Sequence, residues 1–258
     1  MKTDLVRRLT PEEEELAAKR AELTRLGVEL ADRELEIASL KAELGAFEGM
    51  YLRRVGVLYA ELDEWNALLA ELRAEQAGTP EAKAEADEAR TQAEEAYSAA
   101  HGEAANVQPF TPSSDLKRLY REAAKRVHPD TATDEADRAR RERLMKEVNA
   151  AYATGDEDAL RRILAGFDAS PDAVQGLGIG ADLIRVLRQL KQLRDRIAAI
   201  ESEIAGVSEA DLAKLKAKAD LAATEGRDLL AEMAANIQGR VNVARQRVEK
   251  KSDEGTAK

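Results

Sequence analysis

The chain lacks cysteine altogether, has only two histidines, and devotes only 3% of its 258 positions to aromatic residues. Without cysteine there can be no disulfide framework, zinc–thiolate centre or cysteine nucleophile. Two histidines are too few for a multi-histidine metal site. No apolar run approaches the roughly 18 residues of a transmembrane helix, and residues 1–10 lack the apolar stretch of a secretory signal. We therefore expect a cytoplasmic protein with no metal and no cofactor.

Charge, by contrast, is abundant and unbalanced. Lys and Arg number 40 and Asp and Glu number 50, so the net charge is −10. This acidity argues against general nucleic-acid binding, although it permits a local basic patch. The scarcity of aromatic residues and the richness in Ala, Leu, Glu, Lys and Arg disfavour one large globular core and indicate long helices and coiled coils. Since no strand pattern of convincing length occurs, the predicted class is all-α.

The first 104 residues carry the apolar spacing of a coiled coil. Threonine–proline pairs at 10–11 and 79–80 each predict the start of a helix. Between 16 and 72, apolar residues recur in steps of three and four with one change of register, which predicts a long helix with a loosened middle or two helices meeting there. Alanines at the same spacing between 82 and 100 predict a helix that packs back on the first as an antiparallel hairpin.

Glycine and proline mark two predicted linkers, at 105–114 and 167–181, on either side of a compact helical unit at 115–166. After the second linker, apolar spacing predicts two helices joined by a turn, where Ser208 and Asp211 have the spacing of a capping box. We interpret 182–250 as a second antiparallel hairpin, followed by a disordered tail at 251–258. The predicted architecture is long antiparallel coiled-coil hairpins flanking a small helical unit.

The sequence of the small unit opens with DLKRLYREAAKRVHPD, an amphipathic helix and a short turn. Proline disfavours the helical conformation in the residue before it, so Pro129 predicts that the helix ends at His128 and that the His-Pro-Asp turn is exposed. Thr133 is the expected cap of the next helix, and a short third helix is expected to start at Asp156. The polar face of the first helix carries one acid, Glu122, and five bases: Lys117, Arg118, Arg121, Lys125 and Arg126.

These residues resemble the J-domain of the DnaJ-type co-chaperones. LKRLYREAAKRVHPD is similar to the second helix of that family and its hallmark tripeptide, and MKEVNAAY is similar to its third-helix motif. The tyrosine-leucine-glycine helix that usually opens a J-domain is missing before Asp115. We therefore expect Phe110 or a coiled-coil arm to cover the exposed core. The zinc-binding and Gly-Phe-rich regions of full-length DnaJ proteins are also absent, so zinc-dependent client handling is not expected.

What the resemblance implies is a non-enzymatic module that docks on a DnaK-type chaperone, of the heat-shock-seventy class, and stimulates its ATP hydrolysis. The ATP belongs to the partner. The coiled-coil arms would serve targeting or assembly, with another coiled-coil protein or a second copy of the chain. Carried over by position, the tripeptide acts near the interdomain linker of the partner, and the basic helix meets an acidic face of its ATPase domain. The implied partner-binding residues are His128, Pro129, Asp130, Lys117, Arg118, Arg121, Lys125 and Arg126.

Other interpretations remain open at this point. A structural or scaffolding coiled-coil protein with a degenerate J-like module would also explain the missing first helix and the long arms. Nucleic-acid binding through the arginine-rich stretch at 138–143 is a weaker alternative, because the remainder of the chain is acidic. The sequence shows no catalytic triad, phosphate-binding loop or metal constellation, so no catalytic residue is expected.

Overall fold

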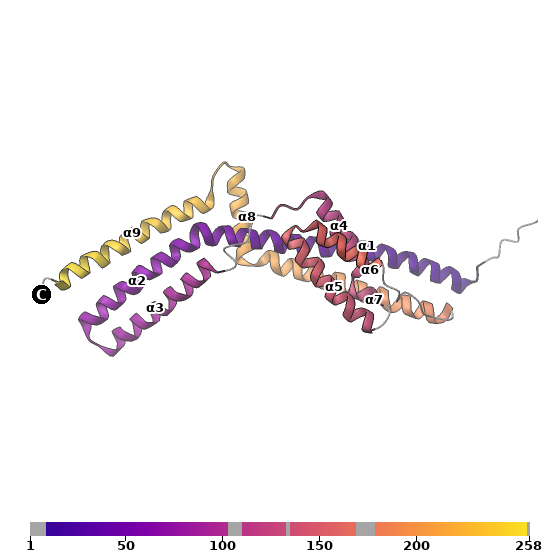
Figure 1. Ribbon diagram of the computed structural model, residues 1–258, viewed down its shortest axis with the longest axis horizontal. Helices are drawn as coiled ribbons and strands as arrows, with labels where there is room; N and C mark the ends of the chain where they lie inside the picture. Colours follow the sequence, from indigo (N-terminus) through magenta and orange to yellow (C-terminus); the bar gives the residue numbers. More distant parts are fainter. Residues whose placement is uncertain (1–8, 103–109, 133–134, 169–178, 257–258) are drawn as a thin grey trace, which may run out of the picture. The chain divides into compact units, whose positions relative to one another are not determined.

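The computed structural model describes residues 9–102, 110–132, 135–168 and 179–256 (Figure 1). These residues form helices and connecting turns without any strand, which confirms the all-α class. The chain divides into two units, Met1–Ala42 with Phe110–Ser208 and Glu43–Pro109 with Glu209–Lys258. The α-helices are α1 (Pro11–Tyr51), α2 (Val57–Ala77), α3 (Pro80–His101), α4 (Ser114–Val127), α5 (Glu135–Thr154), α6 (Glu157–Asp168), α7 (Ile179–Glu209), α8 (Asp211–Thr224) and α9 (Leu229–Thr256).

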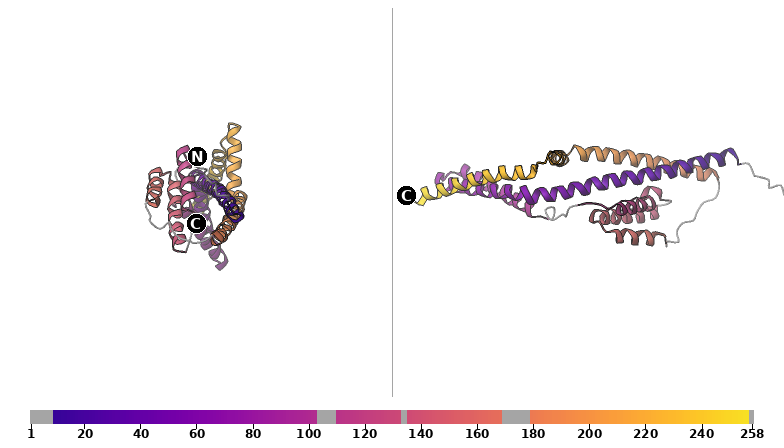
Figure 2. Two further views of the ribbon diagram at one scale, coloured as in Figure 1. Left: turned by 90° about the vertical axis from the view of Figure 1, so that its right-hand side faces the viewer. Right: turned by 90° about the horizontal axis from the view of Figure 1, so that it is seen from above.

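In the first unit, α1 and α7 form a parallel pair and lie side by side (Figure 2). Three polar contacts each join residues that are 162 positions apart, so the two helices advance in the same direction: Arg20 with Asp182, Glu34 with Arg196, and Lys41 with Glu203. The seam buries Leu16, Leu26, Leu30 and Ile37 of α1 against Val186, Leu190, Leu193, Ile197 and Ile200 of α7. The apolar face of α7 is therefore occupied by α1.

In the second unit, α2 and α3 form the antiparallel hairpin that the sequence predicts. Gly78 ends α2 in the left-handed conformation, with a φ of 67°, and the hydroxyl of Thr79 accepts a hydrogen bond from the Ala82 amide at 3.3 Å. The buried face of α3 consists of Ala86, Ala93 and Ala100.

The start of α1 predicted at 10–11 is confirmed as well, since Thr10 and Glu13 exchange the two hydrogen bonds of a capping box.

A π-helical turn, η1 (Leu52–Gly56), connects α1 to α2 without a break in the helical path. Such a turn inserts an extra residue and so shifts the apolar face, which accounts for the change of register in the sequence. A Cβ atom on Gly56 would lie 3.1 Å from Cδ2 of Leu52, tighter than an ordinary contact. The loosened middle of one long helix, rather than two separate helices, is the form that the chain takes.

The prediction of an antiparallel hairpin at 182–250 is wrong about which helices pack together. While α7 packs on α1, α9 packs on α2, with Ile237, Val241 and Ala244 buried against Leu62. A second turn separates α8 from α9. Gly226 has a φ of 75°, and Asp228 accepts a hydrogen bond from the Ala231 amide at 3.0 Å to start α9. Apolar spacing indicated which faces are buried but not which partner covers them.

Two smaller expectations at the C-terminal end also change. The capping box predicted for Ser208 and Asp211 does not form, because α7 continues to Glu209 and the capping position of α8 is Ala210, which has no side-chain bond. The tail predicted to be disordered from 251 is helical as far as Thr256. An ion pair of Arg245 with Glu249, one turn apart, supports the end of this helix.

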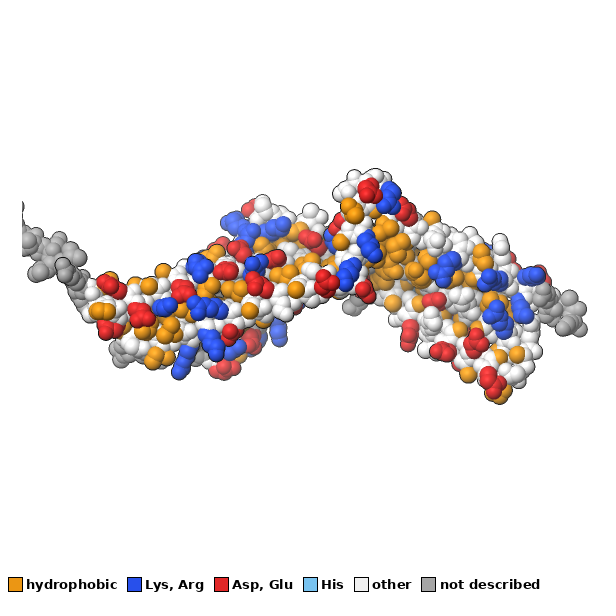
Figure 3. Space-filling model, turned by 180° about the vertical axis from the view of Figure 1, so that it is seen from behind, with side chains coloured by type: hydrophobic (Ala, Val, Ile, Leu, Met, Phe, Trp, Pro, Cys, Tyr) orange, Lys and Arg blue, Asp and Glu red, His pale blue; other side chains and the backbone are white. Residues whose placement is uncertain are grey.

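Surface charge is mixed. Lys and Arg side chains are interspersed with Asp and Glu on the face that Figure 3 displays. Among the helices that the structure describes, none combines the length and apolar character needed to cross a membrane.

Candidate functional site

Helix α4 and the turn after it form as their sequence predicts. The Ser113 hydroxyl accepts a hydrogen bond from the Leu116 amide at 2.9 Å and caps the helix. The helix ends at His128, which has the extended backbone angles of a residue before proline, φ −62° and ψ 129°. Residues Pro129–Thr131 then form a short 3₁₀ turn, η3. The cap predicted at Thr133 lies outside the described residues.

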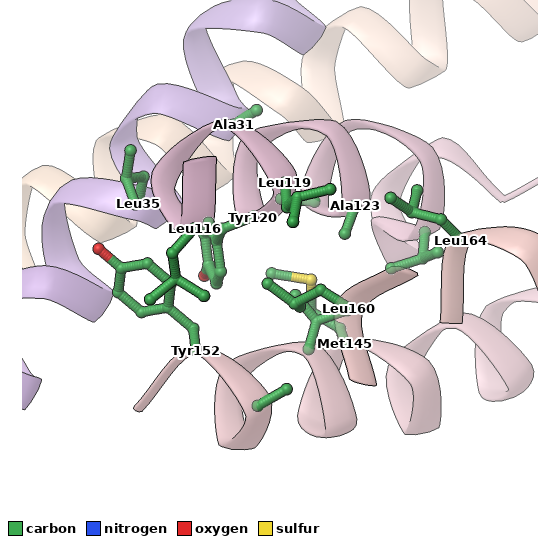
Figure 4. Close-up of a cluster of buried hydrophobic side chains, with 14 residues drawn as sticks. Ala31, Leu35, Leu116, Leu119, Tyr120, Ala123, Met145, Tyr152, Leu160 and Leu164 are labelled. Carbon is green, nitrogen blue, oxygen red and sulfur yellow. The ribbon is translucent and has the colours of Figure 1, made fainter. Parts of the chain in front are cut away.

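The three-helix unit, which we define as α4, α5 and α6, packs around one apolar core (Figure 4). Its rings cluster: Tyr120 and Tyr152 have centroids 4.6 Å apart, and Phe110 meets Tyr152 edge to face at 5.4 Å. Ala31 and Leu35 of α1 belong to the same core. The prediction that Phe110 or a coiled-coil arm covers this core is thus confirmed, since both Phe110 and α1 contribute to it.

The tripeptide histidine is buried, and the prediction of an exposed turn is wrong on this point. The His128 residue is only 2% exposed. Its Nε2 atom lies 3.1 Å from Oε1 of Glu34 on α1, and its Nδ1 atom accepts a hydrogen bond from the Asp130 amide at 3.1 Å. Proline correctly predicted the end of the helix, but the carboxylate that receives the ring comes from a distant part of the sequence.

The contacts of the ring assign its protonation. Because Nδ1 accepts a hydrogen bond, the proton of a neutral imidazole is on Nε2 and is donated to Glu34. His128 therefore serves two purposes in this geometry: it closes its own turn through Nδ1 and it joins the three-helix unit to α1 through Nε2.

Glu34 is the centre of this polar cluster. Oε1 of Glu34 also accepts hydrogen bonds from Nε and Nη2 of Arg196 on α7, at 3.0 and 2.8 Å. Burial alone would raise the pKa of Glu34, but the hydrogen bond from His128 and the charge and hydrogen bonds of Arg196 outweigh it and hold the pKa below its ordinary value. The carboxylate is therefore ionised at neutral pH, and it connects α1, α7 and the tripeptide turn.

Further polar contacts join α1 to the three-helix unit on either side of Glu34. The Arg121 guanidinium lies 3.0 Å from the Asp32 carboxylate. The hydroxyls of Ser39 and Tyr152 are 2.7 Å apart. The Tyr120 hydroxyl donates to Oδ1 of Asn149 at 2.7 Å, and burial, assisted by the charge of Glu34, raises the pKa of this phenol. Polar contacts thus join α1 to the three-helix unit beside the apolar contacts of Ala31 and Leu35.

The other predicted binding residues remain nearer to solvent. Arg118 and Arg126 are exposed and form ion pairs with acids of their own helix, Asp115 and Glu122. Lys117 is half-buried and Lys125 exposed, and neither forms an ion pair within the part of the chain that the structure describes. Pro129 and Asp130 are half-buried, with Arg138 lying 3.9 Å from Asp130. The predicted set is therefore divided, with a solvent-facing part of α4 and an enclosed histidine.

The arginine-rich stretch at 138–143 has structural contacts. Arg141 forms an ion pair with Asp137 at 2.7 Å and donates to the backbone carbonyl of Arg126 and to the Thr131 hydroxyl, both at 2.8 Å. Arg140 and Arg141 both lie over the ring of Phe167. Arg140 and Arg141 therefore contact the tripeptide turn and α6. Because these side chains are engaged within the chain, the nucleic-acid alternative is weakened.

Glu34, Asp32 and Arg196 were not predicted from the sequence as site residues. A partial signal was present, because Ala31, Leu35 and Ala38 form a second stripe of small or apolar residues beside the main seam of α1. Such a stripe indicates that something packs there. It does not indicate what packs there, or that a glutamate within it accepts a histidine.

The remaining candidates for chemistry are few. The second histidine, His101, is exposed and stacks on Tyr97 in its own helix. Within the described ranges, no group of three or more His, Asp or Glu side chains could hold a metal ion. Comparison with models of known protein families, with curated proteins and with solved structures finds no match to this chain.

Proposed function

We propose that the chain is a non-enzymatic co-chaperone that docks on a DnaK-type ATPase of the heat-shock-seventy class and stimulates its ATP hydrolysis. The observation that carries the proposal is a basic amphipathic helix, α4, that leads into His128-Pro129-Asp130 and packs on α5 around a shared apolar core. That combination is what the resemblance to J-domains rests on. The proposal places the chain in the cytoplasm.

The solvent-facing cations of α4 are the part of the site available for a first encounter. Lys117 and Lys125 have no acidic partner among the described residues, and Arg118 is exposed beside Asp115. An acidic surface would gain these cations as partners at little desolvation cost. Contacts of this kind steer association and weaken as salt screens them.

The test is to reverse these charges and measure binding to a DnaK-type ATPase. We expect Lys117→Glu combined with Lys125→Glu to weaken binding by about tenfold at low salt, and raised salt to weaken the wild type in the same direction. Lys146→Glu, an exposed lysine on α5, is the matched control and should leave the affinity unchanged. Equal affinities for the wild type and the double variant, or no binding by the wild type, would refute the proposal.

A structural role is the second candidate, and the burial of His128 favours it. A histidine that joins the three-helix unit to α1, and through Glu34 to α7, has a structural role. In that case the chain is a coiled-coil scaffold with a degenerate module, and the arms bind another coiled coil or a second copy. Full helical content and assembly together with no association with the ATPase at low salt would support this alternative.

A further inference from the structure

Two of the residues that the proposed function assigns to a partner are already bound within the chain. His128 donates to Glu34, and Arg121 pairs with Asp32, and both acids lie on α1. A glutamate and an aspartate two positions apart on one helix thus present to α4 the same chemistry as an acidic docking surface. Lys117 and Lys125 have no acidic partner among the described residues.

We infer that α1 is an internal competitor of the partner and holds the three-helix unit in a closed state. In this state Glu34 and Asp32 occupy His128 and Arg121, and the tripeptide acts on the partner only after α1 is displaced. The identity of the competing partner rests on the proposed function, whereas the closed contact itself is independent of it.

The closed contact depends on the polar cluster more than on apolar packing. From α1, the core of the three-helix unit receives Ala31, Leu35 and the half-buried Ala38, which are two methyl groups and one leucine. By contrast, Glu34 accepts from His128 and twice from Arg196 at a site that is only 4% exposed. A buried hydrogen-bonded cluster of this kind is costly to leave half-satisfied, so losing one member weakens the whole contact.

The core of the three-helix unit is built largely from its own helices, with Ala31 and Leu35 added from α1. Its fully buried side chains come from all three of its own helices, with Tyr120 and Val127 on α4, Val148 and Tyr152 on α5, and Leu160 on α6. Opening is therefore a rearrangement of a packed unit against α1 rather than its unfolding.

Two lysines of α4, the half-buried Lys117 and the exposed Lys125, provide a route from the closed to the open state. A partner can meet Lys117 and Lys125 while Glu34 still holds His128, since neither lysine contacts an α1 acid among the described residues. Binding then proceeds in two steps, an encounter on the exposed face and a replacement of the α1 acids. A ligand shifts such an equilibrium only through contacts that it gains in the open state, and here those contacts are His128 and Arg121.

The closed contact can be tested on the full chain without any partner. Diethyl pyrocarbonate modifies accessible imidazoles, and the chain has one exposed histidine, His101, and one enclosed histidine, His128. We expect rapid modification of His101 and slow modification of His128 in the wild type. Glu34→Gln and Arg196→Gln should each accelerate the modification of His128 by about tenfold, a change equivalent to about 1.4 kcal/mol in the opening equilibrium.

Arg194→Gln is the matched control for these variants. Arg194 also lies on α7 and pairs with an α1 acid, Glu22, but it makes no contact with His128. It should leave the modification of His128 at the wild-type rate. Because Arg196 binds Glu34 from α7, Arg196→Gln changes neither α1 nor the three-helix unit, and it reports on the closed contact even if Glu34→Gln perturbs the packing. Unchanged reactivity of His128 in both variants, or equal reactivity of the two histidines in the wild type, would overturn the closed state.

The second measurement is the ATPase rate of a DnaK-type chaperone with the same variants. We expect Glu34→Gln and Arg196→Gln to stimulate hydrolysis several-fold more than the wild type, and Glu34→Gln with His128→Gln to lose that gain. If His128 becomes reactive and the lysine-dependent binding is present but stimulation does not rise, the competition between α1 and the partner is refuted. If His128 becomes reactive and no lysine-dependent binding exists, the proposed function fails while the closed contact stands.

Discussion

The core of the three-helix unit and the α2–α3 hairpin are both helix-on-helix interfaces, yet they are built from different side chains. The first buries two tyrosines together with leucine, valine and methionine, and a charged cluster closes it against α1. The second buries alanines, including Ala86, Ala93 and Ala100, beside ion pairs of Arg90 with Glu64 and Glu71. Large side chains bury more area, and alanines allow close approach with little area.

These two kinds of interface have different structural consequences. Small residues in a regular spacing give a hairpin whose contact repeats along its length. Large residues and a buried glutamate give a contact that fits in one arrangement. His128 and Arg196 both donate to the same carboxylate oxygen of Glu34, so their hydrogen bonds depend on its position. A site that depends on exact placement of a histidine belongs in the second kind of interface.

The largest effect on this comparison is expected when a large side chain is removed from the core of the three-helix unit. Tyr120 is fully buried, its ring is tilted against that of Tyr152, and its hydroxyl donates to Asn149. We expect Tyr120→Ala to destabilise the unit by about 4 kcal/mol, because the cavity and the lost hydrogen bond add. Hydrogen exchange of the amides of α4 to α6 measures this loss, and those of α2 and α3 should be unaffected.

Tyr120→Phe serves as the control, since it keeps the ring and removes the hydroxyl. Its cost should be about 1 kcal/mol, the value of one hydrogen bond. Similar protection in the wild type and Tyr120→Ala would mean that the ring does not organise this core.

The hairpin is broken by adding volume rather than removing it. Ala93 is 2% exposed on the face of α3 that meets α2, so Ala93→Leu should force the two helices apart at a cost of about 2 kcal/mol. Ala99→Leu, at an exposed position of the same helix, should cost close to nothing. Thermal unfolding followed by circular dichroism compares the two variants, and equal melting temperatures would show that the alanine spacing is not what holds the hairpin.

Acid provides the mildest test of the closed contact. The pKa of Glu34 is below its ordinary value when the chain is folded, so the stabilisation it brings is complete above the ordinary pKa and is lost as the pH falls through the lowered value. We expect amide protection around His128 to hold from neutral pH to about 4.5, the ordinary pKa of a glutamate, and to fall at lower pH as the Glu34 carboxylate is protonated.

Glu34→Gln isolates this effect from the other acids of the unit. The variant has no carboxylate facing His128 and Arg196, so the difference in protection between it and the wild type should shrink as the pH falls. A difference that stays constant down to pH 3 would show that Glu34 does not contribute through its charge.

Much of the secondary structure was predictable because its signals are local. Threonine caps at 10 and 79, the end of α4 before Pro129 and the change of register near η1 all depend on neighbours within a few residues. The break before α9 had a local signal too, a glycine at 226 followed by Asp228, although the sequence analysis did not use it.

The pairing of helices and the burial of His128 were not predictable in the same way. A stripe of apolar residues on α7 could face either α1 or α9 by composition, and the structure places it against α1. The partner of His128 is 94 positions away, and Arg196 is 162 positions from Glu34. No spacing rule connects residues so far apart.

The central claim is that the tripeptide histidine is held by Glu34 in the folded chain. Two-bond proton–nitrogen correlation spectra of the two histidines test it most directly, because they distinguish the two neutral tautomers and report the exchange of the ring N–H with water. The account predicts that His128 is the Nε2–H tautomer with a slowly exchanging, hydrogen-bonded proton that disappears in Glu34→Ala, while His101 exchanges rapidly in both. A His128 ring that exchanges as fast as that of His101 would contradict it.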